Sequence, residues 1–212
     1  RVGAEPVDKL KKIEHASPML SLQAVADLDE VENFINFVRQ NTHGHENAFV
    51  LEPKIDGFSV EVVYQNGRFA YGATRGNGMM GEDISHNLKT IGSLPLHLQG
   101  GTNFPSFLAV RGEVFMPKAG FQELNQTRVQ NGAEPFANPR NAAAGLMRQL
   151  DSRMVAGKPL DIIFYDILKV DDAYRFSSHW QILEQLPAWA LKTSPYNRKV
   201  SGIEEMTRYY QS

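Results

Sequence analysis

The sequence contains no cysteine, which excludes a disulfide framework and a cysteine-ligated zinc site in this segment and fits a reducing compartment. No apolar run approaches the ~20 residues that a membrane span requires. The first residues, RVGAEPVDKLKK, lack the apolar core of a signal peptide and also an initiator methionine. We therefore expect a soluble, intracellular segment of a longer protein that has no membrane partner.

The sequence also lacks a large excess of charge of either sign. A formal net charge of −2 excludes a uniformly basic surface, although the 22 Lys and Arg residues could form a local basic strip. The hydrophobic content of 42% is ordinary for a soluble globular protein. With no internal repeat and no linker composition, one α+β domain is expected to account for all 212 residues.

Local patterns predict the elements of that domain. Residues 1–26 are predicted to be an irregular lead-in, and Asp27 is predicted to cap a helix with an apolar stripe at positions 28, 31, 34, 35 and 38. Strands are predicted within 48–75, with a turn at Asn66-Gly67, and at 107–115 and 160–168. Further helices are predicted at 117–130, at 138–150, from Ser178 until Pro187 interrupts it, and at 199–212.

Lys54 is the first candidate for chemistry, because it ends a predicted strand in the segment EPKIDG. A lysine amine attacks phosphorus or a carbonyl carbon only when it is deprotonated, which burial or a nearby cation can favour. Taken alone, a surface lysine before an Asp-Gly turn explains the segment better, since so short a match arises easily by chance.

Three other segments are candidates for nucleotide or nucleic-acid binding. Glu113, in VRGEVF, could hold ribose hydroxyls or form an ion pair on a sheet surface. The loop GNGMMGED after Arg75 could approach phosphates through backbone N–H groups, or be an ordinary turn. Arg140 and Arg148 lie eight residues apart, near two helical turns, and could grip a nucleic-acid strand or be solvated. The six histidines show no metal-ligand spacing, so no metal site is predicted.

Five blocks occur in a specific order: HASPMLSL, EPKIDG, ATRGNGMMGED, VRGEVFMPKAGFQELN and FANPRNAAAGLMRQLD. Together they give a sequence that resembles the adenylation (nucleotidyltransferase) domain of bacterial NAD-dependent DNA ligases over residues 1–212, least distinctively over 170–212. The resemblance implies an α+β nucleotidyltransferase (ATP-grasp-like) fold, with antiparallel or mixed sheets flanked by helices. It also implies that residues 1–212 are most of one adenylation domain.

In such ligases a lysine attacks the adenylyl phosphorus of NAD, which gives lysyl-AMP and releases nicotinamide mononucleotide. AMP then passes to the 5′-phosphate of nicked DNA before the 3′-hydroxyl displaces it. The resemblance assigns the catalytic step to Lys54 and Asp56. It assigns binding of NAD and AMP to Ser21, Leu22, Glu52, Arg75 and Glu113. Arg140 and Arg148 match the block that grips DNA or the nucleotide phosphate.

The resemblance further implies NAD and Mg²⁺ as cofactors, nicked double-stranded DNA as partner, and a monomer in the bacterial cytoplasm that serves DNA repair and replication. Parts of such ligases are missing from the sequence. They are an N-terminal domain that binds nicotinamide mononucleotide, and C-terminal completing strands, OB-fold, zinc finger, helix-hairpin-helix and BRCT modules. Zinc is therefore expected only outside this chain, and the isolated chain is expected to react poorly with NAD.

Some positions depart from the family's pattern, in which the glycine-rich loop usually reads Gly-Asp-Gly-Thr-Thr-Gly-Glu-Asp. The departures are Ala24, Ala26, Asn77, Met79, Met80 and Leu146. Two alternatives stay open: a non-catalytic fragment that binds nucleotide or DNA, and an ATP-dependent ligase or capping relative. The latter share Lys-x-Asp-Gly but are not expected to contain FANPRNAAAG.

Overall fold

The computed structural model describes residues 9–25, 27–42, 48–101 and 104–211. Its helices are α1 (Leu28–Asn41), α2 (Ser85–Leu88), α3 (Lys118–Gln130), α4 (Pro139–Met147), α5 (His179–Ala188) and α6 (Ile203–Gln211). Its strands are β1 (Lys12–Glu14), β2 (Phe49–Leu51), β3 (Phe58–Gln65), β4 (Arg68–Thr74), β5 (Met80–Glu82), β6 (Phe107–Phe115), β7 (Asp161–Val170) and β8 (Arg198–Val200). The α+β class with antiparallel sheets flanked by helices is confirmed.

The chain forms two compact units. The sheet unit is built from the described residues up to Met19 together with Ile55–Thr193, and the second unit from Leu20–Lys54 together with the described residues from Ser194 onward. The chain passes from the second unit into the sheet unit between Lys54 and Ile55. Each unit has its own sheet and its own helices.

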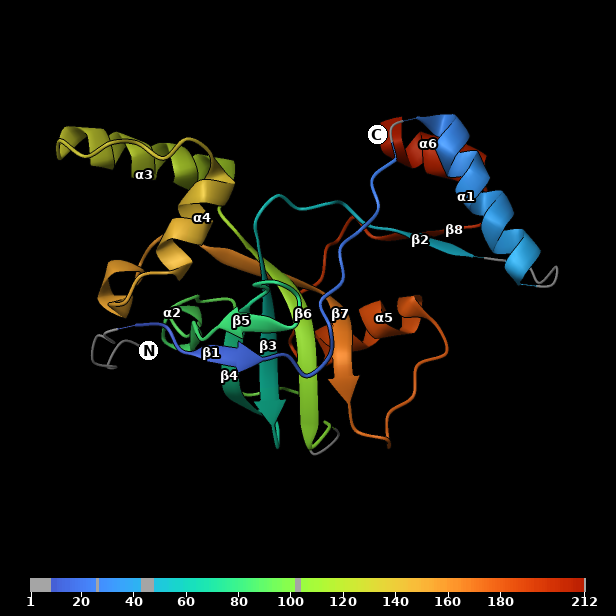
Figure 1. Cartoon of the computed structure of the whole chain (residues 1–212), viewed down its shortest axis with the longest axis horizontal. Coiled ribbons are helices and arrows are strands. Elements are labelled where there is room, and N and C mark those ends of the chain that lie inside the picture. Colours follow the sequence, from blue (N-terminus) through green and yellow to red (C-terminus); the bar gives the residue numbers. More distant parts are fainter. Residues whose placement is uncertain (1–8, 26, 43–47, 102–103, 212) are drawn as a thin grey trace. The chain divides into compact units, whose positions relative to one another are not determined.

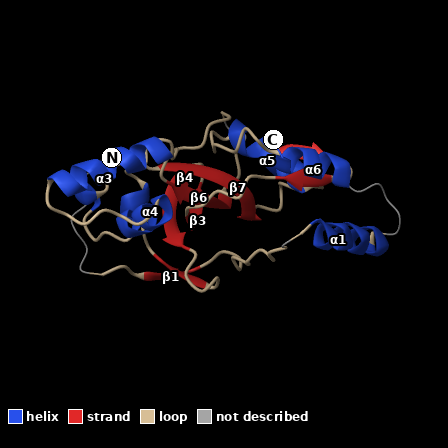
Figure 2. Cartoon of the chain, turned by 90° about the horizontal axis from the view of Figure 1, so that it is seen from above, coloured by secondary structure: helices blue, strands red, loops and turns tan. Residues whose placement is uncertain are grey.

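A four-stranded antiparallel sheet, in the order β4-β3-β6-β7, forms the centre of the sheet unit (Figure 1). The turn between β3 and β4 is the predicted one, with φ of 48° at Asn66 and 70° at Gly67. The β6 strand has the bounds that the sequence predicted, 107–115. Helix α4 lies beside this sheet (Figure 2). It also contacts α2 and α3.

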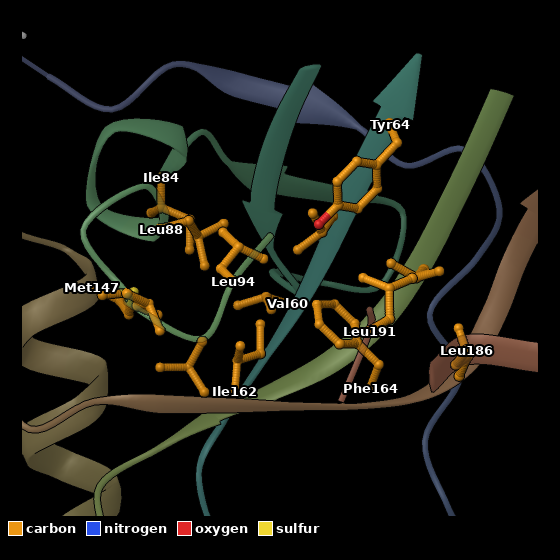
Figure 3. Close-up of a cluster of buried hydrophobic side chains, with 14 of the residues drawn as sticks. Val60, Tyr64, Ile84, Leu88, Leu94, Met147, Ile162, Phe164, Leu186 and Leu191 are labelled. Atoms are coloured by element: carbon orange, nitrogen blue, oxygen red, sulfur yellow. The ribbon is translucent and has the colours of Figure 1, made fainter. Parts of the chain in front are cut away.

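One face of this sheet carries the apolar core of the unit (Figure 3). Side chains alternate along a strand, so Val60, Val62 and Tyr64 of β3 point to the same side. They are wholly buried there with Phe164 of β7 and with Leu88 of α2. Near the start of β3 the opposite face is polar, because Ser59 and Glu61 lie there and pair in the register with Glu113 and Arg111 of β6. Further along β3 this face carries the buried Val63.

The second unit is smaller. Its helix α1 is capped as predicted, because Asp27 Oδ1 accepts the Glu30 N–H at 2.9 Å. Strands β2 and β8 pair antiparallel, α1 contacts α6, and the Phe34 and Phe49 rings meet edge to face at 6.2 Å. Of the predicted apolar stripe on α1, Ile35 is buried, whereas Leu28 and Phe34 are more than half exposed.

Several predicted bounds were wrong. The described part of the 1–26 lead-in contains β1, which pairs with β5 of the glycine-rich loop, a contact between residues about 70 apart that no local pattern reveals. Residues 198–200 form a strand before the last helix. Pro187 does not interrupt α5, because it lies in the last turn and α5 ends one residue later. Ala26, His43 and His45 lie outside the described residues.

Candidate functional site

The segment 56–58, which leads into β3, is the centre of the candidate site. Gly57 runs so close to β6 that a Cβ there would lie 2.4 Å from the Val114 carbonyl oxygen and 2.9 Å from Glu113 Cγ. Only glycine fits at that approach. The Asp-Gly pair of the EPKIDG block therefore places the backbone directly against the Glu113 side chain.

Two arginines at opposite ends of α4 contact the residues on either side of Gly57. Arg140 Nη1 donates to Asp56 Oδ1 at 3.0 Å. The Arg148 guanidinium lies 5.3 Å from the centre of the Phe58 ring, and its Nε donates to Glu82 Oε2 at 3.2 Å. Exposed ion pairs of this kind contribute little to stability, so these arginines remain available to other anions.

Helix α4 forms for local reasons. Asn138 caps it, with Oδ1 accepting the Asn141 N–H at 2.8 Å, and Pro139 takes the first position, so the helix starts where the sequence predicted. Its small residues Ala142 and Ala143 are buried. The helix ends at Met147, so Arg148 is the C-cap and not part of a continuous face with Arg140. The two arginines reach the same short segment from the two ends of the helix.

The polar face of the sheet continues the site across three strands. Tyr165 OH and Ser59 Oγ are 3.1 Å apart, Arg111 Nε donates to Ser59 Oγ at 3.5 Å, and the Arg111 guanidinium lies 5.4 Å from the Tyr165 ring centre. Glu113 pairs with Ser59 in the register and is buried. Burial raises the pKa of Tyr165, the Ser59 hydrogen bond and Arg111 lower it, and Glu113 raises it again.

Arg75, at the end of β4, is held by its backbone. Its N–H donates to the Ser59 carbonyl oxygen at 3.1 Å, and its own carbonyl oxygen accepts from His15 Nε2 at 3.0 Å. His15 Nδ1 lies 2.7 Å from Glu61 Oε2, and Glu61 Oε1 accepts the Ala16 N–H at 3.0 Å. The His15 and Glu61 side chains are 1% and 0% exposed, so the backbone of Arg75 is fixed by a buried pair.

The glycine-rich loop has an internal structure of its own. Asn77 Oδ1 accepts the N–H groups of Met79 and Met80 at 3.0 Å and 2.9 Å. The loop carbonyl groups of Met79 and Gly78 accept the N–H groups of His15 and Met19. Two of the backbone N–H groups that could have approached a phosphate are thus bonded within the loop, so the departure at Asn77 has a structural role.

Four predicted residues lie in the second unit. Lys54 is exposed, as are Ser21 and Leu22, the latter with 78% of its surface accessible. Glu52 is half-buried. Burial raises the pKa of Tyr209, the Arg198 charge lowers it, and the Glu52 charge raises it. Each unit therefore holds one part of the predicted set.

The sheet unit brings together five of the predicted residues. They are Asp56, Arg75, Glu113, Arg140 and Arg148. Sequence reasoning missed Ser59, Arg111 and Tyr165, although the alternation of polar and apolar residues in β3 was a signal for Ser59. Guanidinium groups for phosphates, a buried carboxylate for hydroxyl groups and an aromatic ring form a set of groups that fits a nucleotide.

Among the described residues, no group of three or more His, Asp or Glu side chains could hold a metal ion. In the same part of the chain, every helix is too short or too polar to cross a membrane.

Comparison with known proteins decides the family. The family described as NAD-dependent DNA ligase adenylation domain matches residues 7–212. The chain belongs to this family. The adenylation domain is 46% identical over 209 residues to a DNA ligase of Haloferax volcanii, covering 99% of this chain and 29% of that protein.

Two other relatives agree. A DNA ligase of Geotalea daltonii is 44% identical over 214 residues, which cover 100% of this adenylation domain and 32% of the relative. A DNA ligase of Nitrosococcus oceani is 43% identical over 211 residues, which cover 100% and 31%. The chain thus spans less than a third of the length of each of these relatives, and the resemblance inferred from the five sequence blocks is confirmed.

Proposed function

We propose that this domain carries out the adenylation step of an NAD-dependent DNA ligase, with a nucleotidyltransferase fold and Lys54 as nucleophile. The Lys54 amine attacks the adenylyl phosphorus, so that a P–N bond forms and the amine loses a proton. The P–O bond to nicotinamide mononucleotide breaks, and that group leaves with the bonding electron pair. The product is lysyl-AMP.

The arrangement around Gly57 carries the proposal. Asp56 and Glu113 lie on either side of this close approach, and Arg140 and Arg148 lie beside it. Phosphoryl transfer is catalysed mainly by positioning and by neutralising charge, and guanidinium groups serve both purposes. A buried carboxylate such as Glu113 is suited to accept hydrogen bonds from ribose hydroxyls.

Binding of NAD and AMP is proposed for Ser21, Leu22 and Glu52 as well as for Arg75 and Glu113. In the step that follows, AMP passes to the 5′-phosphate of nicked double-stranded DNA, and Arg140 and Arg148 contact the phosphates. Mg²⁺ would be held by the nucleotide phosphates together with an exposed carboxylate such as Asp56, and would neutralise charge there. A monomeric ligase of the bacterial cytoplasm, active in DNA repair and replication, is the proposed setting.

The test is the intact mass after incubation with NAD and Mg²⁺. It compares this chain, a version extended at both ends with the flanking sequence of its own gene, and the extended Lys54→Ala and Lys54→Arg variants. Lys54→Arg keeps the positive charge but removes the nucleophilic amine, so it is the matched control. We expect the extended protein to gain one AMP, both variants to gain none, and nicotinamide mononucleotide to reverse the gain.

The other outcomes distinguish the alternatives. A gain with ATP but not with NAD would favour an ATP-dependent relative. No gain in an extended protein that is folded would favour a non-catalytic fragment that binds nucleotide or DNA. A strong reaction of the isolated chain that depends on Lys54 would contradict the expectation that it reacts poorly alone.

A further inference from the structure

Asn87 of α2 is a buried polar residue outside the cluster around Gly57, yet it contacts the backbone of that cluster. Its Nδ2 donates to the Met147 carbonyl oxygen at 2.8 Å and to the Gln149 carbonyl oxygen at 2.7 Å. These are the carbonyl groups of the two residues that flank Arg148. Both hydrogens of the amide are therefore used to hold the backbone on either side of one arginine.

This contact closes the end of α4. The last carbonyl groups of a helix have no partner within the helix and need one elsewhere. The C-cap Arg148 has φ of −96° and ψ of 7°, and the Gln149 N–H bonds back to the Leu146 carbonyl oxygen at 3.1 Å. Asn87 then fixes the direction in which the chain leaves the helix, and with it the direction of the Arg148 side chain.

Helix α2 is itself firmly attached to the sheet. Gly72 of β4 donates its N–H to Ser85 Oγ at 2.9 Å and accepts the Ile84 N–H at 2.9 Å. Leu88 packs so tightly on Gly72 that a Cβ added to Gly72 would lie 2.2 Å from Leu88 Cδ1. Asn87 thus transmits the position of the β4 strand to the end of α4.

Asn87 also has an unused acceptor. The residue is 0% exposed, and its Oδ1 has no hydrogen-bond partner among the described residues. A buried amide oxygen without a partner is unfavourable for stability. The side chain is therefore suited to its position by its two donor hydrogens. The neighbouring His86 also bonds the Gln149 carbonyl oxygen, at 2.9 Å, but this hydrogen bond is exposed to solvent.

We infer that Asn87 is a positioning residue for Arg148, which it holds over Phe58 by fixing the two flanking carbonyl groups. The inference rests on the proposed function, in which Arg148 binds a phosphate of the nucleotide or of the nicked strand. Asn87 itself touches neither. Its effect on the reaction passes through Arg148 alone, and this distinguishes it from a residue that only stabilises the fold.

The test is a double-mutant cycle in the extended protein with Asn87→Ala, Arg148→Ala and the combination. Two rates are measured: AMP uptake from NAD, and sealing of a nicked duplex with a 5′-phosphate by protein that already carries AMP. Arg148→Ala shows which rate depends on the arginine. We expect Asn87→Ala to slow that same rate about tenfold or more, because a small misplacement of a catalytic group has effects of this size. The combined variant should be no slower than Arg148→Ala alone.

Two controls separate positioning from folding. Leu186→Ala removes a buried side chain of α5, a helix that contacts β7, so it lowers the melting temperature without removing a hydrogen bond to the end of α4, and should leave both rates within about twofold. Asn87→Ser keeps one donor and replaces Asn87→Ala in the cycle if that variant does not fold. Its effect on the rate should also be absent in protein that carries Arg148→Ala.

The outcomes are distinct. If the unsubstituted protein takes up no AMP, the proposed function and this inference both fail. If it takes up AMP but the Asn87 effect persists in the Arg148→Ala background, or Leu186→Ala slows the same rate equally, the inference alone is overturned.

Discussion

Glu61→Ala is expected to weaken the sheet unit strongly, because it breaks the buried pair between His15 and Glu61. After the substitution the Ala16 N–H has lost its acceptor, a change that costs about 1–3 kcal/mol in a buried site. The hydrogen bond between the carboxylate and the imidazole is also lost, at about 1.5–3 kcal/mol. Together these agree with the about 3–5 kcal/mol typical of removing one partner of a buried pair. The free energy of unfolding should fall by this amount.

Glu61→Gln should be far milder. The His15 Nε2 donates to the Arg75 carbonyl oxygen, which can only accept, so that nitrogen carries a hydrogen in any state. A neutral imidazole with its hydrogen on Nε2 leaves Nδ1 as an acceptor for the glutamine amide. The glutamine oxygen still accepts the Ala16 N–H, so every contact of the pair is replaced by a neutral one. We expect a loss of about 1 kcal/mol.

The measurement is urea unfolding followed by tryptophan fluorescence. Trp189 contributes to this signal, since it is 1% exposed and meets the Tyr174 ring edge to face at 5.5 Å. Arg153→Ala is the control: its ion pair with Asp151 is as short, 2.6 Å, but the two side chains are 65% and 25% exposed. Its midpoint should not move, since exposed pairs contribute little. A Glu61→Ala midpoint that matches that of the unsubstituted chain, or a Glu61→Gln loss as large as that of Glu61→Ala, would refute the reasoning.

Two other predictions concern the site itself. Gly57→Ala should destabilise the sheet unit by about 1–3 kcal/mol and slow AMP uptake, because the new Cβ would press on the Val114 carbonyl group and on Glu113. Thermal melting measures the stability and the mass assay measures the uptake. An unchanged melting temperature would contradict this prediction. Glu113→Gln should lower the pKa of Tyr165, which burial raises above 10.0 and Glu113 raises further, so the phenolate absorbance should rise at lower pH than in the parent. Because that pKa is raised on folding, the associated stabilisation is fully present below the unfolded value of 10.0 and is lost as the pH rises through the folded value.

Local signals were enough to predict much of the fold. The cap at Asp27, the helix starts at Asn138-Pro139 and Ser178, and the turn at Asn66-Gly67 depend on residues within one turn of each other, and all were predicted correctly. Of the strands of three residues, β2 lies within the predicted range 48–75, whereas β1, β5 and β8 were not predicted. Strand β1 exists because β5 lies beside it, and a pattern of three residues carries no information about a distant partner.

The sequence supplied some of the residues that lie together in the candidate site, and their roles stay predictions. The conspicuous blocks supplied Asp56, Glu113, Arg140 and Arg148, which the sheet unit does bring together. Tyr165 and Arg111 were missed because only the strand register places them beside Ser59. Asn87 was missed for a related reason, since its importance lies in two carbonyl groups about 60 residues further along the chain.

The two arginines of α4 already hold carboxylates, Arg140 that of Asp56 and Arg148 that of Glu82. A DNA phosphate that takes either arginine must therefore displace an anion that belongs to the protein. Binding to DNA normally releases condensed cations, which makes the affinity fall steeply with salt, by about 0.9 in log–log slope for each phosphate neutralised. Here each displaced carboxylate attracts a cation again, and part of that release is cancelled. The DNA affinity proposed for this surface should consequently vary less with salt concentration than its number of arginines implies.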